Sequence, residues 1–239
     1  MAIQEAERFD EVWRHGKYDG FSHGTGGQTT TPFLEALLKK LNGRLTRLPH
    51  VIEGGAGSGD HSLTIVRRGC RVTSIEYSNR AVDKIKALKQ VQPCSYRDRI
   101  TVVQADLLSY LRNCTESALA FYANSVLHFF SSDERAEVYE RVRDLLQPDN
   151  GLIAVSFKAE GDALQSRGEP VEETEAGVLV KSREDDITRL FVRDPKALSR
   201  EIEQAGYLVP DGSIHRWEVH GYNYSGEAGK FVGFLGVKR

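Results

Sequence analysis

The stretch VIEGGAGSGDHSL, residues 51–63, begins with an apolar run and holds four glycines in its first nine positions. The run predicts a strand, and the residues after the glycines predict a helix. A glycine loop between a strand and a helix points free backbone N–H groups and the positive end of the helix dipole at a ligand. In α/β sheets this place is the carboxyl end of the strand, where cofactors bind. The stretch therefore predicts a cofactor site.

Strand-like and helix-like segments alternate on either side of this loop. The strand-like segments are residues 50–55, 71–77, 99–106, 118–124 and 151–157, and the helix-like segments are residues 60–69, 78–90 and 131–146. Ser78 is placed to cap the second of these helices, and Ser131 with Glu134 forms a capping box for the third. The alternation predicts βαβ units and an α/β fold whose sheet is mostly parallel, with helices around it.

The segments before and after this alternation differ from it in composition. We expect one domain with four parts: N-terminal helices and an arm (1–49), a cofactor-binding core (50–158), a polar, acidic cap (159–187), and C-terminal strands with a helix (188–239). Thr31 and Pro32 open a helix with an apolar stripe that ends at Asn42. Residues 208–239 read as two antiparallel strands joined by the turn SGEAGK.

Composition excludes several classes of function. The formal net charge is −2 with both signs interspersed, so no basic surface for a nucleic acid or an anionic membrane is indicated. No run of about 18 apolar residues predicts a membrane span, and the acidic N-terminus does not resemble an export signal. Cys70, Cys94 and Cys114 have no metal-ligand spacing. We expect a cytoplasmic protein, monomer or homodimer, with no metal, nucleic-acid or membrane partner.

The spacing of the glycines decides which kind of glycine-rich cofactor loop the sequence resembles. A phosphate-binding P-loop needs Lys and then Ser or Thr after its last glycine, whereas Asp60 and His61 follow Gly59 here. A dinucleotide fingerprint would need glycine at position 60. The observed pattern is G-x-G-x-G, and Glu53 precedes it.

Glu53, the loop from Gly55 to Gly59, and Asp60 resemble the first motif of class I S-adenosylmethionine-dependent methyltransferases. This cofactor carries a carboxylate and an ammonium but no phosphate, so it needs close backbone approach and an acidic partner. Glu76 ends the next strand, 21 residues after Gly55, near the offset at which an acid reaches a ribose. The resemblance implies a Rossmann-like, seven-stranded, mostly parallel sheet with an antiparallel C-terminal strand, S-adenosylmethionine as cofactor and S-adenosylhomocysteine as product.

Two later strand ends agree with the resemblance. It implies that Asp106 accepts the adenine amino group while the Leu107 amide meets the ring; Asp106 as a simple helix cap is the alternative. Asn124 would bind the cofactor's ammonium. The resemblance implies this set of cofactor-binding residues: Trp13, Glu53, Gly55, Ala56, Gly57, Gly59, Glu76, Tyr77, Asp106, Leu107 and Asn124.

The methyl acceptor is expected to be a small molecule. Asn124-Ser125-Val126-Leu127 departs from the Asn/Asp-Pro-Pro-aromatic motif of nucleic-acid amino methyltransferases, which disfavours base methylation. The loop region, a leading tryptophan and a glycine-rich arm look most similar to the thiopurine and tellurite methyltransferases. Methyl transfer from a sulfonium is an in-line displacement to O, N or S, for which alignment and exclusion of water are the chief requirements.

Two histidines are candidate catalytic bases, because imidazole titrates near neutral pH. His128 follows the fourth strand, and packing against the cofactor is its alternative role. His23 lies in the N-terminal arm, where Tyr18 and Phe21, with Trp13, would form an aromatic wall; a surface loop is the alternative.

Lys158, Glu160 and Asp162 follow the fifth strand, at an edge that borders the acceptor pocket in the resembled family, unless they are solvated charges. Lys158 and Glu160 are the candidate acceptor-binding residues. An RNA or protein methyltransferase and a non-catalytic cofactor-binding protein are the rival functions. A dinucleotide-dependent oxidoreductase is the least favoured function, because Asp60 stands where the dinucleotide fingerprint needs a glycine.

Overall fold

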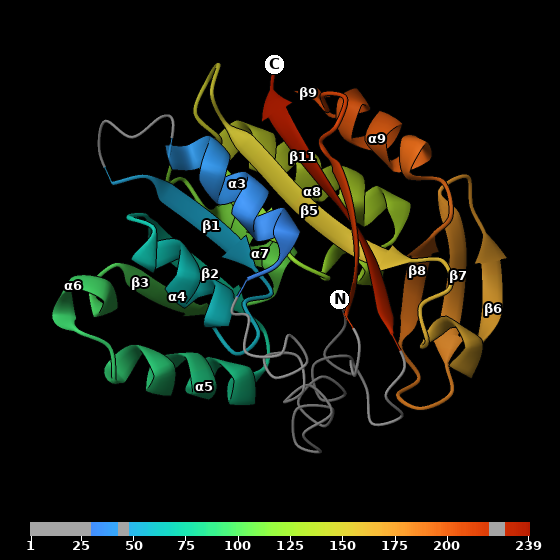
Figure 1. Cartoon of the computed structure of the whole chain (residues 1–239), viewed down its shortest axis with the longest axis horizontal. Helices are drawn as coiled ribbons and strands as arrows, with labels where there is room; N and C mark the ends of the chain where they lie inside the picture. The colour runs from blue at the N-terminus through green and yellow to red at the C-terminus, as the bar shows by residue number, and fades with distance from the viewer. Residues whose placement is uncertain (1–29, 43–47, 220–227) are drawn as a thin grey trace.

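The computed structural model describes residues 30–42, 48–219 and 228–239, and it consists of one sheet flanked by helices (Figure 1). The first five strands of the chain pair in parallel in the order β3-β2-β1-β4-β5. These strands are β1 (His50–Gly54), β2 (Arg71–Glu76), β3 (Ile100–Gln104), β4 (Ala120–Ala123) and β5 (Leu152–Ala159). These are the five strands that the alternation of the sequence predicts, so the predicted α/β class and the parallel core are confirmed.

Helices cover both faces of this sheet. They are α3 (Pro32–Asn42), α4 (Asp60–Arg67), α5 (Asn79–Gln90), α6 (Cys94–Arg97), α7 (Leu107–Asn113), α8 (Ser132–Leu145) and α9 (Pro195–Gln204). The apolar residues of α3 and α4 share one core cluster with β1, and those of α7, α8 and α9 share a second cluster on the opposite face. The predicted apolar stripe of α3 is buried throughout, which fixes that helix against the sheet.

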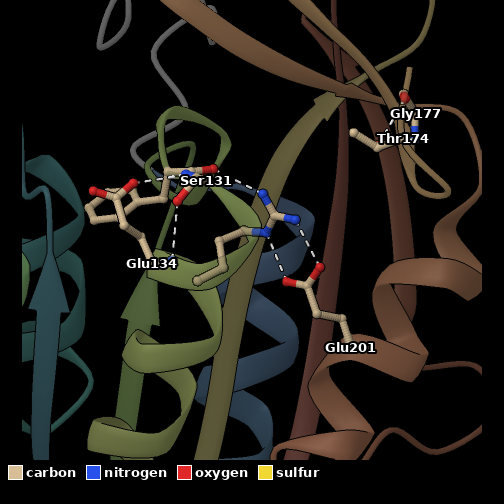
Figure 2. Close-up of polar contacts among 7 residues, drawn as sticks. Ser131, Glu134, Thr174, Gly177 and Glu201 are labelled. Carbon is tan, nitrogen blue, oxygen red and sulfur yellow. Dashed lines mark hydrogen bonds and ion pairs between the residues drawn. The ribbon is translucent and has the colours of Figure 1, made fainter. Parts of the chain in front are cut away.

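The predicted helix caps are confirmed, and one of them appears in Figure 2. The Ser78 hydroxyl accepts a hydrogen bond from the Ala81 amide at the start of α5. Ser131 and Glu134 form the reciprocal capping box of α8. One turn along, Arg135 donates to both carboxylate oxygens of Glu201 in α9 at 2.8 Å and is almost fully buried. This ion pair joins α8 to α9.

The C-terminal hairpin is also confirmed. β10 (Ile214–Val219) pairs antiparallel with β11 (Gly229–Lys238), and β11 pairs antiparallel with β5 and with the short β9 (Tyr207–Leu208). Gly233 of β11 lies against the Phe33 ring of α3, where a Cβ would come within 2.7 Å of a ring carbon. The glycine therefore allows α3 to approach the hairpin closely.

Residues 159–187, the expected cap or insertion, consist largely of strands. After the 3-10 turn η2 (Gln165–Arg167), they form β6 (Gly168–Glu173) and β7 (Gly177–Ser182), and β8 (Thr188–Val192) follows. The sheet has eleven strands in the described residues rather than seven. Thr174 closes the β6–β7 turn by hydrogen bonds to both backbone groups of Gly177 (Figure 2). Three of the acidic residues that suggested a solvated cap, Glu169, Glu172 and Glu173, lie on the exposed strand β6.

The pairing of β5 shows where these extra strands lie. Leu152–Val155 pair with β4 on one edge and with β11 on the other. β4 ends at Ala123, and further along β5 Lys158 pairs with Phe191 of β8 on one edge and with Phe231 of β11 on the other. β8 therefore takes the place of β4 beside the last residues of β5. Figure 1 shows β8, β7 and β6 beside the tip of the β5 arrow. The extra strands β6, β7 and β8 therefore form an insertion next to the carboxyl end of β4.

Several predictions concern residues outside the described ranges. These are the part of the expected N-terminal helices and arm that precedes residue 30, with Trp13, Tyr18, Phe21 and His23. None of the helices in the described part of the chain has the length and hydrophobicity needed to span a bilayer.

Candidate active site

The glycine loop has the backbone conformation that its sequence predicts. Gly55, Gly57 and Gly59 have φ values of 65°, 57° and 85°, in the left-handed region that other residues rarely adopt. Gly59 is the N-cap of α4. A Cβ on Gly55 would lie 2.3 Å from Cγ2 of Val126. The loop therefore touches the segment after β4, so the first and fourth predicted motifs meet.

Glu76 holds the glycine loop against the end of β2. Its carboxylate accepts hydrogen bonds from the backbone N–H of Gly57 at 2.8 Å, Tyr77 at 2.8 Å and Ser78 at 3.0 Å. Hydrogen bonds to a carboxylate are among the stronger ones in proteins. Glu76 thus fixes the loop at the place where the sequence predicts that it binds a ribose, and the ribose contact itself stays a prediction.

Glu53 lies beneath the loop and is almost fully buried. Its Oε2 accepts hydrogen bonds from Ser62 of α4 and, at 3.4 Å, from Ser74 of β2. Burial raises the pKa of Glu53 from 4.5 to about 8, and the two serine hydroxyls only partly oppose this. The carboxyl group therefore joins β1, β2 and α4, and its predicted contact with an ammonium remains to be tested.

We expect Glu53→Gln to change how stability depends on pH. The folded protein keeps the Glu53 proton up to about pH 8, whereas the unfolded chain releases it near pH 4.5. Between these values the unfolded state binds fewer protons, so the Glu53 contribution is complete below pH 4.5 and is lost as the pH rises towards 8. Urea unfolding from pH 5 to 8 should show wild type losing stability relative to the glutamine variant, and parallel curves would contradict this.

Asp106 and Leu107 stand where β3 leads into α7. Asp106 is the N-cap of α7, and its Oδ1 accepts a hydrogen bond from the Ser109 amide at 2.9 Å. Its Oδ2 is buried and has no hydrogen-bond partner within the described residues. Asp106 therefore does cap helix α7, which was the alternative role that we considered for it. Its Oδ2 remains for the predicted contact with the adenine amino group.

The segment after β4 turns sharply at Ser125. This residue has φ 57°, and its amide donates to the Ser156 hydroxyl at 2.9 Å. The same hydroxyl donates to Oδ1 of Asn124 at 2.9 Å. Backbone strain of this kind at a non-glycine residue is concentrated at functional sites. Asn124 is thus held at the carboxyl edge of the sheet, beside the glycine loop.

His128 lies in the 3-10 turn η1 (Leu127–Phe129) and is almost fully buried. Its ring centroid is 4.0 Å from that of Phe129. Burial, with the positive charges of Arg189 and Lys158 next in order, lowers the pKa of His128 well below 6.5. Nδ1 has no hydrogen-bond partner among the residues that the structure describes. The imidazole is therefore neutral near pH 7, and burial disfavours its protonated form.

The structure separates Lys158 from Glu160. The Lys158 ammonium is buried, donates to Asp162 at 2.9 Å and lies 4.3 Å from the centroid of the Phe231 ring. Glu160 is exposed, and its carboxylate accepts a hydrogen bond from Arg193 at 2.8 Å on the protein surface. Lys158 is therefore buried within β5, whereas Glu160 lies on the protein surface.

Sequence reasoning missed two charged residues of this region, Arg189 and Asp185, and it named Asp162 only as a member of the charge cluster after the fifth strand. Arg189 is buried in β8, pairs with Asp185 and lies 5.3 Å from the centroid of the Phe129 ring. Asp162 is the buried partner of Lys158. The one sequence signal was an arginine inside the apolar strand ITRLFV, because a buried charge needs a partner. No group of three or more His, Cys, Asp or Glu in the described ranges is placed to hold a metal ion.

Comparison with known proteins agrees with this geometry. Residues 51–149 match the family model of a methyltransferase domain. No curated protein sequence matches the chain at a significant level.

Several solved structures have a similar fold. One is the 1,6-didemethyltoxoflavin-N1-methyltransferase of Burkholderia thailandensis, with bound 1,6-didemethyltoxoflavin and S-adenosylhomocysteine: 18% identity, 100% of this chain and 91% of that chain covered, TM-score 0.66. Another is the magnesium protoporphyrin IX methyltransferase of Synechocystis with bound S-adenosylmethionine: 12% identity, coverage of 100% and 99%, TM-score 0.63. A third is a glycopeptide N-methyltransferase complexed with S-adenosylmethionine: 18% identity, coverage of 85% and 86%, TM-score 0.57.

The resemblance to class I S-adenosylmethionine-dependent methyltransferases is confirmed, because the chain contains a methyltransferase domain on the fold that these structures share. Residues 51–149 are therefore a methyltransferase domain, on a fold shared with these S-adenosylmethionine-dependent enzymes. At these identities the structural neighbours establish the fold, and the identity of the acceptor has to be argued from the residues of this chain.

Proposed function

We propose that the protein binds S-adenosylmethionine at the glycine loop and transfers its methyl group to O, N or S of a small molecule. The observation that carries this proposal is the meeting of the loop, Glu76, Asp106 and Asn124 at one edge of the sheet. The backbone N–H groups of the loop suit the cofactor's carboxylate, Glu76 suits its ribose, and Asp106 suits its adenine. The neighbours crystallised with this cofactor or its product support the assignment.

The cofactor supplies an activated methyl group on a sulfonium. The protein's own part is therefore to align the acceptor in line with the S–CH₃ bond and to exclude water. As the acceptor atom takes the methyl group, the S–CH₃ bond breaks and its electron pair stays on sulfur. If the acceptor atom bears a proton, that proton passes to the neutral imidazole of His128, whose Nδ1 is unpartnered within the described residues.

We expect His128→Gln to lower kcat about 100-fold or more, which is the lower range for a general base. The affinity for S-adenosylhomocysteine should stay within about twofold of wild type, because the proposed role of His128 is in proton transfer rather than cofactor binding. Steady-state kinetics and calorimetry measure the two quantities separately. His215→Gln in β10 is the matched control. Equal losses in kcat and affinity would show instead that His128 packs against the cofactor.

A methyl-transfer screen tests the acceptor class. The purified chain is incubated with radiolabelled S-adenosylmethionine and, in parallel, with a library of small hydroxy, amino and thiol compounds, total RNA, and a mixture of unfolded proteins. The proposal predicts label in small molecules alone. Label in RNA or protein alone would favour the rival macromolecular methyltransferases, and cofactor binding without any transfer would favour a non-catalytic protein.

A further inference from the structure

His61 is a histidine at the start of helix α4 that has no role in the proposed methyl transfer. It is the second residue of α4, two positions after Gly59, the last glycine of the loop. No side chain of the described residues caps this helix, and its first N–H bond is that of Leu63 to the Gly59 carbonyl at 2.9 Å. The three amides before Leu63 therefore have no intrahelical partner. His61 thus lies where the loop and the helix present N–H donors to a ligand.

A chain of hydrogen bonds holds one nitrogen of the His61 ring. Its Nδ1 atom lies 3.0 Å from the hydroxyl of Tyr122, a fully buried residue of β4, and the two rings meet edge to face. The Tyr122 hydroxyl is also hydrogen-bonded to the side chain of Thr31, the residue before α3. The Thr31 oxygen accepts from the Leu34 amide at 3.1 Å, and its hydrogen is left for Tyr122. This chain joins α3, β4 and α4 beside the glycine loop.

The direction of these hydrogen bonds fixes the tautomer of His61. Burial, with the charge of Glu53 next in order, raises the pKa of Tyr122 well above 10, so the hydroxyl keeps its proton. Burial lowers the pKa of His61 to about 4, and the charge of Asp60 opposes this only in part. The imidazole is therefore neutral at pH 7 and carries one N–H group. Because Nδ1 accepts from Tyr122, this N–H group is at Nε2.

The other ring nitrogen of His61, Nε2, is accessible from solvent. It makes no hydrogen bond within the described residues, and it is not among their buried atoms that lack a partner. The residue as a whole is partly exposed. Because Tyr122 fixes the ring through Nδ1, the Nε2–H group points in one defined direction. His61 therefore offers a fixed donor that a ligand can reach.

The predicted position of the cofactor's ammonium is close to His61. Ser62, the next residue of α4, donates a hydrogen bond to Glu53, and the charge of Glu53 acts on Tyr122. Glu53 is the residue that we predict to bind the ammonium. In S-adenosylmethionine the ammonium and the carboxylate are attached to the same carbon atom, so the groups that bind them must lie close together. An N–H donor beside Glu53 therefore suits the carboxylate.

We propose that His61 is a further cofactor-binding residue, whose Nε2–H group donates a hydrogen bond to the carboxylate of S-adenosylmethionine. Tyr122 is the positioning residue that holds the His61 ring for this contact. The inference rests on the proposed function and deepens it, because it assigns a residue to the amino-acid end of the cofactor, whereas Glu76 and Asp106 serve the adenosine end. A hydrogen bond to a carboxylate is among the stronger ones, so its loss is measurable.

Calorimetry on the full chain with two ligands tests the proposal. One ligand is S-adenosylhomocysteine, and the other is S-adenosyl-3-thiopropylamine, which is the same compound without its carboxylate. His61→Phe keeps a flat ring and removes both nitrogens. We expect this variant to bind S-adenosylhomocysteine about tenfold more weakly or worse, and the thiopropylamine compound within about twofold of wild type. A merely structural role of His61 would weaken both ligands alike.

Three further variants complete the test. His61→Gln keeps an acceptor for Tyr122 and a donor for the carboxylate, so it should bind S-adenosylhomocysteine more tightly than His61→Phe does. Tyr122→Phe releases the His61 ring and should weaken this binding roughly threefold. Tyr207→Phe is the matched control, because it removes a buried hydroxyl that donates to the Tyr139 carbonyl at 2.9 Å, between β9 and α8. Its affinity for both ligands should equal that of wild type.

Three outcomes would overturn the proposal while leaving the proposed function intact. They are unchanged binding of S-adenosylhomocysteine in His61→Phe, an equal loss of both ligands in that variant, and a wild type that binds the two ligands equally tightly. A wild type that binds neither ligand would overturn the proposed function, and this inference with it. The two failures are therefore distinguishable from the wild-type titration alone.

Discussion

Gly55→Ala is expected to weaken S-adenosylhomocysteine binding at least about 100-fold. Two effects combine at this position. The backbone has φ 65°, which disfavours any residue with a Cβ by about 1–2 kcal/mol. The new methyl group would also lie 2.3 Å from Cγ2 of Val126, so the loop and the segment after β4 would have to move apart. Calorimetric titration of wild type and variant measures the loss.

Gly69→Ala separates backbone strain from steric overlap. Gly69 has φ 89°, but a Cβ there would have nothing within 4 Å. This variant should lose about 1–2 kcal/mol of stability through strain alone and keep its cofactor affinity. Adding Val126→Ala to Gly55→Ala removes the overlapping methyl group and should restore part of the binding. Unchanged affinity in Gly55→Ala would show that the loop does not hold the cofactor.

Glu76→Ala is expected to weaken cofactor binding by about 1.5–3 kcal/mol, which corresponds to roughly 10- to 150-fold. The variant removes the acceptor for three backbone N–H groups, including that of Gly57 in the loop. It should also lower the free energy of unfolding, because those N–H groups lose their charged partner.

Glu76→Gln is the graded control for this prediction. It keeps the side-chain shape and one acceptor oxygen but replaces the other with a donor, so its affinity should fall between those of wild type and alanine. Calorimetry with S-adenosylhomocysteine measures affinity, and urea unfolding measures stability. If Glu76→Ala binds as wild type does, Glu76 has no place in the site.

Local signals predicted the elements of this fold well. The stripe of α3 is buried at all five predicted positions, namely Phe33, Leu34, Leu37, Leu38 and Leu41. The caps at Ser78 and Ser131 and the left-handed glycines of the loop also follow from short-range chemistry. These features depend on neighbouring residues, so a single sequence is enough to locate them.

Features set by distant pairing were harder to predict. β6 pairs with β7, and β7 pairs with β8, although three of the six residues of β6 are acidic. Glu160 was grouped with Lys158 by proximity in the sequence, yet the chain turns after β5, where Gly161 has φ 79°. The ion pairs Lys158–Asp162 and Arg189–Asp185 are each four residues apart, but the sequence does not show that they are buried. Burial depends on the whole sheet, which local patterns do not describe.

The most direct test of the account is a calorimetric titration of the full chain with S-adenosylmethionine, S-adenosylhomocysteine and NAD. The account places an adenosyl sulfur cofactor on a loop whose Asp60 departs from the dinucleotide fingerprint. It predicts saturable binding of both adenosyl compounds at one site and no binding of NAD. Binding of NAD together with a lack of binding of both adenosyl compounds would contradict it.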